Sequence, residues 1–161
     1  MYRLILALLA LAACAPRPDP VVPGFRAADA PIYSSTVVDP GLMAGRWVQV
    51  ATFANGGSAC APGTVDFAGD QVTWDLCLAD GMQSGQSALI AGKPGRFGVS
   101  GMQDWWVLWV DADYRTLVIG TPSGRFGFVL NRAAQMPSDR ITAVRDILRF
   151  NGYAIEKMTT F

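Results

Sequence analysis

The sequence predicts an all-β domain in which eight antiparallel strands follow one another as a meander, before one helix and a short final strand. Short runs alternate apolar and polar residues, turn residues separate these runs, and one late segment has helical spacing. The composition agrees, because 17 glycines and a charged fraction of 16% suit a turn-rich β domain better than a helical bundle. At 161 residues the chain suits one domain.

The first predicted strand covers about 45–54 and opens with Gly45-Arg46-Trp47. Successive side chains in a strand point to opposite faces. Alternation therefore places four side chains of this strand on one face: Trp47, Gln49, Ala51 and Phe53. A flexible loop, Asn55-Gly56-Gly57-Ser58, follows it.

Two cysteines lie in the next two predicted strands, about 60–67 and 71–78, which flank the turn Ala68-Gly69-Asp70. By alternation, Cys60 and Cys77 share a face and lie within one or two residues of being opposite each other. In an oxidising compartment we expect them to form a disulfide, worth about 3 kcal/mol. Two free buried thiols are the alternative.

Five further strands and a helix complete the predicted domain. The strands cover about 83–91, 96–101, 104–110, 116–120 and 125–132. The helix starts near 137–139 with Ser138 as its N-cap, and Asn151-Gly152 is its stop signal. Its apolar stripe consists of Ile141, Val144, Ile147 and Leu148. Residues 153–161 follow as a short strand or a packed tail.

The N-terminus has the features of an exported lipoprotein. Arg3 precedes an apolar run too short to span a bilayer, as in a signal peptide. Leu11-Ala12-Ala13-Cys14 resembles the bacterial lipobox, which implies removal of residues 1–13 and acylation of Cys14, with palmitate among the chains. Several chains anchor a protein stably. Ala15 fits sorting to the outer membrane, with the domain facing the periplasm. An ordinary secretory signal with an incidental cysteine is the alternative.

Residues 14–40 are expected to form a tether between the anchor and the folded domain. Six of the ten prolines lie between positions 15 and 40, and such a density favours an extended, semi-rigid spacer.

The residue inventory argues against several functions. The chain has no histidine, which removes the commonest general base and metal ligand. We therefore expect no cofactor and no metal. The formal net charge is zero without any Lys/Arg run, which argues against a nucleic-acid partner.

The order of strands and helix resembles the plan of the lipocalins, in particular those of the bacterial outer membrane. Three motifs carry the resemblance: Gly45-Arg46-Trp47, Asp113-Tyr114 and Arg132. The resemblance covers about 41–161 and implies a closed, eight-stranded up-and-down barrel with the helix packed outside it. It also implies that the barrel is closed at one end by Gly45, Trp47, Asp113, Tyr114 and Arg132, with Arg132 stacked on Trp47.

A barrel of this kind encloses a cup, whose lining is predicted by alternation. The predicted ligand-binding residues are Phe53, Val65, Phe67, Trp74, Leu76, Phe97, Trp105, Val107 and Phe128. The resemblance implies fatty acids or lysophospholipids as ligands, carried or stored in envelope maintenance, and a homodimer is possible. A barrel with a filled core that binds a protein partner, as protease inhibitors do, is the alternative. An enzyme would need aspartates, arginines or tyrosines converging in the cup.

Overall fold

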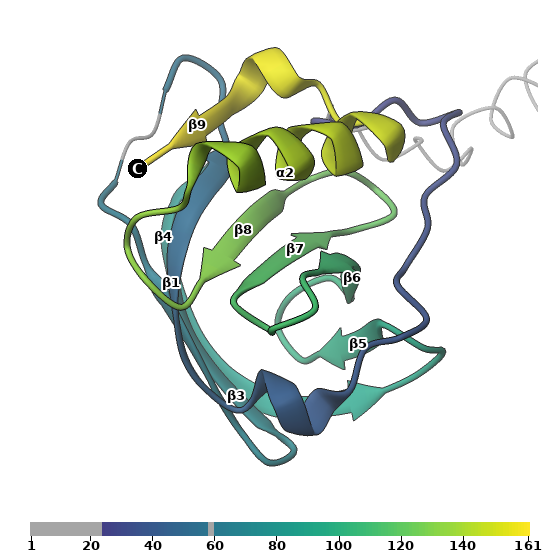
Figure 1. The fold of residues 1–161 in the computed structure, drawn as a ribbon, viewed down its shortest axis with the longest axis vertical. Coiled ribbons are helices and arrows are strands. Elements are labelled where there is room, and N and C mark those ends of the chain that lie inside the picture. The colour runs from purple at the N-terminus through teal and green to yellow at the C-terminus, as the bar shows by residue number, and fades with distance from the viewer. Residues whose placement is uncertain (1–23, 58–59) are drawn as a thin grey trace, which may run out of the picture.

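The computed structural model describes residues 24–57 and 60–161 and shows a closed antiparallel β-barrel with a helix packed outside it (Figure 1). The strands of the barrel are β1 Gly45–Phe53, β2 Thr64–Ala68, β3 Gln71–Leu78, β4 Gly81–Ala91, β5 Arg96–Val99, β6 Trp105–Val110, β7 Thr116–Gly120 and β8 Gly127–Asn131. Each strand pairs with the next, and β1 closes the ring by pairing with both β2 and β8. The predicted fold class is confirmed.

A ninth strand, β9 (Met158–Thr160), lies outside the barrel and continues the sheet beside β1. The first half of β1 pairs with β2, from Gly45 to Val48, whereas its last residues, Ala51 to Phe53, pair with β9. The prediction that the second strand begins near residue 60 was wrong, because β2 begins at Thr64. Pro62 lacks an N–H to donate to a ladder, so a strand does not continue through it.

The helix α2 (Ser138–Phe150) lies across the outside of the barrel above β7 and β8 in Figure 1. Val144 and Leu148 from the predicted stripe are fully buried beneath it. The prediction that Ser138 caps the helix was wrong. Ser138 is the first helical residue, Pro137 occupies the N-cap position, and no side chain caps the helix. After α2, Gly152 adopts a φ of +82°, which ends the helix.

Buried apolar side chains form two clusters, one on each side of the barrel wall. The interior cluster fills the barrel. Its residues come from every barrel strand except β4, and Met43 and Phe126 belong to it as well. The outer cluster lies between the barrel and α2 and includes Phe53, Val144 and Tyr153.

Residues 24–39, which we name the strap, pack along the barrel and lead into the short 3-10 helix η2 (Pro40–Met43). Figure 1 shows the strap in purple, running from the end of α2 down one side of the barrel. Phe25 is 5% exposed, and the Nε atom of Arg26 donates to the Asn151 carbonyl at 2.8 Å. Further along, the backbone N–H of Ser35 donates to the Val107 carbonyl at 2.7 Å. Residues 24–39, which lie within the stretch 14–40 expected to form the tether, therefore pack on the barrel.

Candidate functional site

The closed end of the barrel is built around Arg132 and Trp47. The guanidinium carbon of Arg132 lies 3.8 Å from the centre of the Trp47 ring, so the implied stacking is present. Trp47 is fully buried, and its Nε1 atom donates to the Met43 carbonyl at 2.7 Å. Gly45 has a φ of +92°, and a Cβ atom at this position would lie 3.4 Å from Arg132 Nη1. A side chain at Gly45 would therefore strain the backbone and lie in contact with the arginine.

Backbone carbonyl groups surround the Arg132 guanidinium. Its Nη2 atom donates to the carbonyls of Ala44 at 2.9 Å and Leu42 at 3.2 Å, and its Nη1 atom donates to that of Arg46 at 3.2 Å. Partial burial lowers the pKa of Arg132, while the carboxylate of Asp66 acts in the opposite direction. These bonds attach η2 to the end of β8, which closes the barrel below Trp47.

The predicted turn between β6 and β7 also contributes to this end, through Tyr114 and not through Asp113. Tyr114 adopts a φ of +51°, and its hydroxyl accepts from Asp39 N at 2.7 Å and donates to the Val37 carbonyl at 3.1 Å. Asp113 is exposed and pairs only with the neighbouring Arg115 among the described residues. Asp111, which we did not nominate, holds the turn by accepting from Arg115 N and Thr116 N. A short polar residue opening a turn was the available signal.

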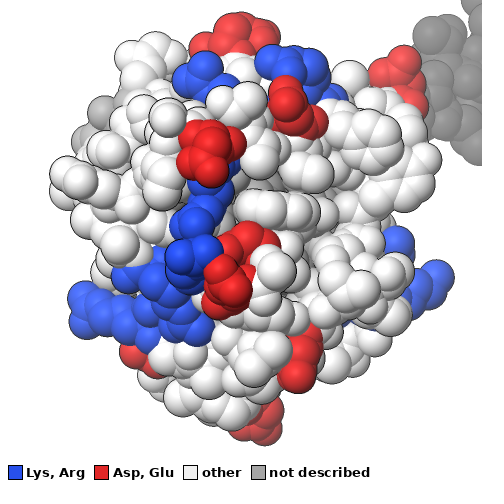
Figure 2. All heavy atoms as spheres, in the orientation of Figure 1, with Lys and Arg blue, Asp and Glu red and all other residues white. Residues whose placement is uncertain are grey.

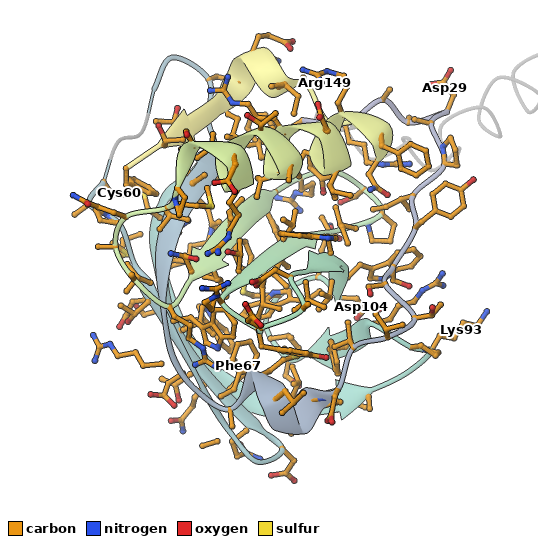
Figure 3. The ribbon with its side chains drawn as sticks, viewed as in Figure 1. Asp29, Cys60, Phe67, Lys93, Asp104 and Arg149 are labelled. Carbon is orange, nitrogen blue, oxygen red and sulfur yellow. A yellow bond between two sulfur atoms is a disulfide. The ribbon has the colours of Figure 1, made fainter. Side chains whose placement is uncertain are left out.

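Eight of the nine predicted cup residues lie in the interior cluster: Val65, Phe67, Trp74, Leu76, Phe97, Trp105, Val107 and Phe128. They pack against one another. The Trp105 ring meets those of Phe67, Trp74 and Phe128 edge-on, at centroid distances of 6.4, 5.8 and 5.2 Å. Figure 3 labels Phe67 among the side chains that fill the barrel. The predicted lining is therefore a packed aromatic core.

Phe53 lies on the other side of the wall, and its prediction as a cup residue was wrong. The pairing of β1 with β8 shifts register between Gln49 and Ala51, which inserts a bulge. One extra residue reverses the alternation beyond it. Thr52 is then opposite Phe128 on the inner face, whereas Phe53 packs against Tyr153 at a centroid distance of 4.9 Å in the outer cluster.

Trp105 leaves one polar atom of the core unsatisfied. Trp105 is 1% exposed, and its indole N–H has no acceptor among the described residues. A buried donor without a partner costs about 1–3 kcal/mol. An acceptor on a bound molecule that reached this depth would remove that cost.

The open end holds a pocket of about 300 Å³, which we name the mouth pocket. Three loops and two strands line it: residues 79–80 between β3 and β4, residues 101–103 between β5 and β6, residues 125–126 between β7 and β8, Leu78 of β3 and Gln83 of β4. Leu78 and Phe126 belong to the interior cluster, and Met102 packs against it. The remaining lining includes Asp80, Gln83, Gln103 and Arg125. Polar groups thus surround an apolar floor, and none of the predicted cup residues reaches this pocket.

A comparison with protein families matches residues 93–161 to the model described as "Lipocalin-like domain". The fold is lipocalin-like. Over 55 residues the chain is 36% identical to temperature-induced lipocalin-1 of Arabidopsis thaliana, and this covers 34% of the chain and 30% of the plant protein. The chain therefore matches less than a third of the length of that relative.

Solved structures agree with this fold. One, titled "The Siderocalin Ex-FABP functions through dual ligand specificities", has a TM-score of 0.55 at 17% identity and covers 74% of this chain and 93% of that chain. Another, of Per a 4, a major allergen from cockroaches, has a TM-score of 0.54 at 13% identity and covers 82% of this chain and 93% of that chain. A lipocalin-like barrel is consistent with the binding of a small hydrophobic ligand.

The predicted disulfide between Cys60 and Cys77 of this lipocalin-like barrel is confirmed, with a Cα–Cα distance of 5.7 Å. Gln49, for which no role was predicted, holds the backbone of Cys77. Gln49 is fully buried, its Nε2 atom donates to the Cys77 carbonyl at 2.8 Å, and its Oε1 atom accepts from Cys77 N at 2.9 Å. Thr52 donates to the same carbonyl at 2.8 Å. A glutamine at an inward position between apolar neighbours was the signal for it.

Cys14 lies outside the described residues. Within residues 24–57 and 60–161, no helix has the length and apolar character needed to span a bilayer. In the same ranges, no three His, Cys, Asp or Glu side chains gather where they could hold a metal ion. On the face drawn in Figure 2, positive and negative side chains are interspersed over a largely uncharged surface.

Proposed function

We propose that this protein binds fatty acids or lysophospholipids at the open end of its barrel and carries or stores them in envelope maintenance. The mouth pocket is the observation that carries this proposal, because its polar rim surrounds an apolar floor continuous with the core. A single-chain lipid has the same two parts. The role is binding, and no step of it requires chemistry on the ligand.

The apolar floor supports burial of at least the first part of an acyl chain. Each methylene group removed from water contributes about 0.8 kcal/mol. The volume of about 300 Å³ lies at the lower end of the range for small-molecule pockets. A long chain therefore has to displace Phe126, which forms part of the floor at 8% exposure, before it reaches the packed rings below.

The proposal includes attachment to the periplasmic face of the outer membrane through acylated Cys14. The lipobox-like sequence before this cysteine supports it. Mass spectrometry of the protein from a bacterial host tests the anchor. We expect a mature chain that starts at Cys14 and carries acyl chains, and an unmodified Cys14 would refute the anchor.

Titration of delipidated protein with a fluorescent fatty acid tests lipid binding. We expect saturable binding of one molecule per barrel. Met102→Asp, which places a charge at the floor of the pocket, should weaken this binding at least tenfold. The matched control is Met82→Asp, because Met82 is 47% exposed and does not line the mouth pocket. A lack of saturable binding by the unchanged protein would end the proposal.

The filled interior favours a second candidate, binding of a protein partner at the rim of the barrel. Eight of the predicted cup residues pack together and leave the mouth pocket above them as the ligand space. Native mass spectrometry of protein purified from its own envelope separates the candidates. A bound lipid of a few hundred daltons supports carriage, whereas a stoichiometric protein complex without lipid supports the second candidate.

A further inference from the structure

The headgroup end of the mouth pocket has groups of both charges, and neither charge is neutralised by another described residue. Arg125 lies at its β7–β8 side and Asp80 at its β3–β4 side, and both side chains are exposed. The ion pairs of the described chain involve Arg115 and Arg149, so Arg125 and Asp80 pair neither with each other nor with another residue of 24–57 or 60–161. Both charges are thus available to a bound molecule.

Gln103 adds an oriented donor on the same side as Arg125. Its Oε1 atom accepts from Thr121 Oγ1 at 3.0 Å and also from the Ser123 hydroxyl. Thr121 is 1% exposed, so the first of these bonds comes from a fixed, buried group. With Oε1 occupied, the NH₂ group of Gln103 has no acceptor among the described residues. The Ser123 hydroxyl also accepts from Arg125 N at 3.2 Å. Ser123 therefore links Gln103, in the β5–β6 loop, to Arg125, in the β7–β8 loop.

We propose that the mouth pocket selects amphiphiles with a zwitterionic headgroup. The anionic oxygen atoms of the headgroup bind to Arg125 and Gln103, and its cationic group lies near Asp80. This inference rests on the proposed function and narrows its ligand class toward lysophospholipids that carry both charges. A purely anionic headgroup would meet the carboxylate of Asp80, and a purely cationic one would meet Arg125, so each loses part of the attraction.

The test uses three ligands that share a twelve-carbon tail and differ in the headgroup: dodecylphosphocholine, dodecyl phosphate and dodecyltrimethylammonium. Each is used below its micelle concentration to displace the fluorescent fatty acid from the delipidated full chain. We expect dodecylphosphocholine to bind about fivefold more tightly than either singly charged ligand, the size of effect that exposed charge pairs give. Because the tails are identical, any difference reports the headgroup.

Two variants assign the charges. Arg125→Gln should weaken dodecylphosphocholine and dodecyl phosphate by about fivefold and leave dodecyltrimethylammonium unchanged or tighter. Asp80→Asn should weaken dodecylphosphocholine and dodecyltrimethylammonium and tighten dodecyl phosphate. The controls are Lys93→Gln and Asp29→Asn, because both side chains point away from the molecule in Figure 3. Both controls should bind all three ligands as the unchanged protein does.

The outcomes separate this inference from the proposed function. Saturable binding with equal affinity for the three headgroups would overturn the zwitterion inference and leave lipid carriage intact. Variants that behave like the two controls would overturn it as well. If the fluorescent fatty acid and all three dodecyl ligands fail to bind, the proposed function itself is refuted.

Discussion

The side-chain amide of Gln49 bonds to both backbone groups of Cys77, accepting from its N–H at 2.9 Å and donating to its carbonyl at 2.8 Å. Its Oε1 atom also accepts from Gly63 N at 3.1 Å. β2 starts only at Thr64, so β3 has no strand neighbour at Cys77 on that side. The glutamine side chain supplies the bonds that a strand would have made, next to the point where the Cys60–Cys77 disulfide links the loop before β2 to β3.

Gln49→Leu should therefore lower the free energy of unfolding by about 3 kcal/mol. The substitution removes the side-chain amide and leaves the N–H groups of Cys77 and Gly63 buried without an acceptor. Urea denaturation of both proteins measures the difference. Gln86→Leu serves as the control because Gln86 is exposed on β4, and its effect should stay within about 0.5 kcal/mol. Equal stabilities for Gln49→Leu and the unchanged protein would show that the amide bonds contribute nothing.

Removal of Arg132 tests the closed end of the barrel. Arg132→Leu loses the stacking on Trp47 and the bonds to the carbonyls of η2, and we expect a cost of about 2–4 kcal/mol. Arg132→Lys keeps the charge but not the planar group, so it should recover less than half of this loss. The exposed neighbour Arg46→Lys is the matched control. Chemical denaturation followed by tryptophan fluorescence measures all three, and full recovery by lysine would argue that charge alone matters.

Much of this fold was predictable because strand alternation and turns are local. β3 and β7 have the predicted limits, and the helix begins within a residue of its predicted start. Phe53 was misplaced because a bulge depends on the pairing partner, in this case β8, and alternation along one strand cannot reveal it. The prolines of the strap indicate an extended chain, but its packing on the barrel depends on distant partners such as Asn151 and Val107, which no local pattern reveals.

The candidate site was less predictable for a related reason. Eight of the nine predicted cup residues lie on the inner face, but the sizes of their rings decide whether the barrel is hollow or filled. Trp74, for example, lies over Gly85, where an added Cβ atom would come within 3 Å of the ring. The mouth pocket comes from three loops that are distant in sequence, and no pattern within one loop brings Asp80 and Arg125 together.

The raised pKa of Tyr153 predicts that the protein loses stability at high pH. Burial of its hydroxyl away from water raises the pKa of Tyr153 from 10.0 to about 12, although the hydrogen bond from Thr121 N and the charge of Arg26 act in the opposite direction. The hydroxyl donates to the Phe126 carbonyl at 3.0 Å and accepts from Thr121 N at 2.9 Å. The folded-state value exceeds the unfolded one, so this contribution is complete below pH 10 and is lost as the pH rises toward 12. The shift corresponds to about 3 kcal/mol. Thermal unfolding between pH 8 and pH 12 should show the loss.

Tyr153→Phe separates this residue from the other groups that titrate at high pH. The variant should be less stable than the unchanged protein at pH 8 by about 1–3 kcal/mol, because it leaves Thr121 N without its acceptor. The difference between the two proteins should shrink as the pH rises through this range. A constant difference from pH 8 to pH 12 would show that Tyr153 does not titrate as expected.

Phe126 links the stability of the barrel to its ligand capacity, since it lines the mouth pocket and stacks on Phe128 at a centroid distance of 6.0 Å. Phe126→Ala should lower the free energy of unfolding by about 3 kcal/mol and enlarge the floor of the pocket. A sixteen-carbon fatty acid should then gain affinity relative to a ten-carbon one, because more methylene groups leave water.

Phe25→Ala is the control for this prediction. Phe25 is 5% exposed and, like Phe126, is an aromatic residue near the β7–β8 loop. It differs from Phe126 because it packs in the outer cluster, against Phe53. Its truncation should cost similar stability without changing the preference for chain length. Isothermal titration with the two fatty acids measures that preference. If both variants alter it equally, the effect comes from a looser barrel, and if neither does, the acyl chain does not pass Phe126.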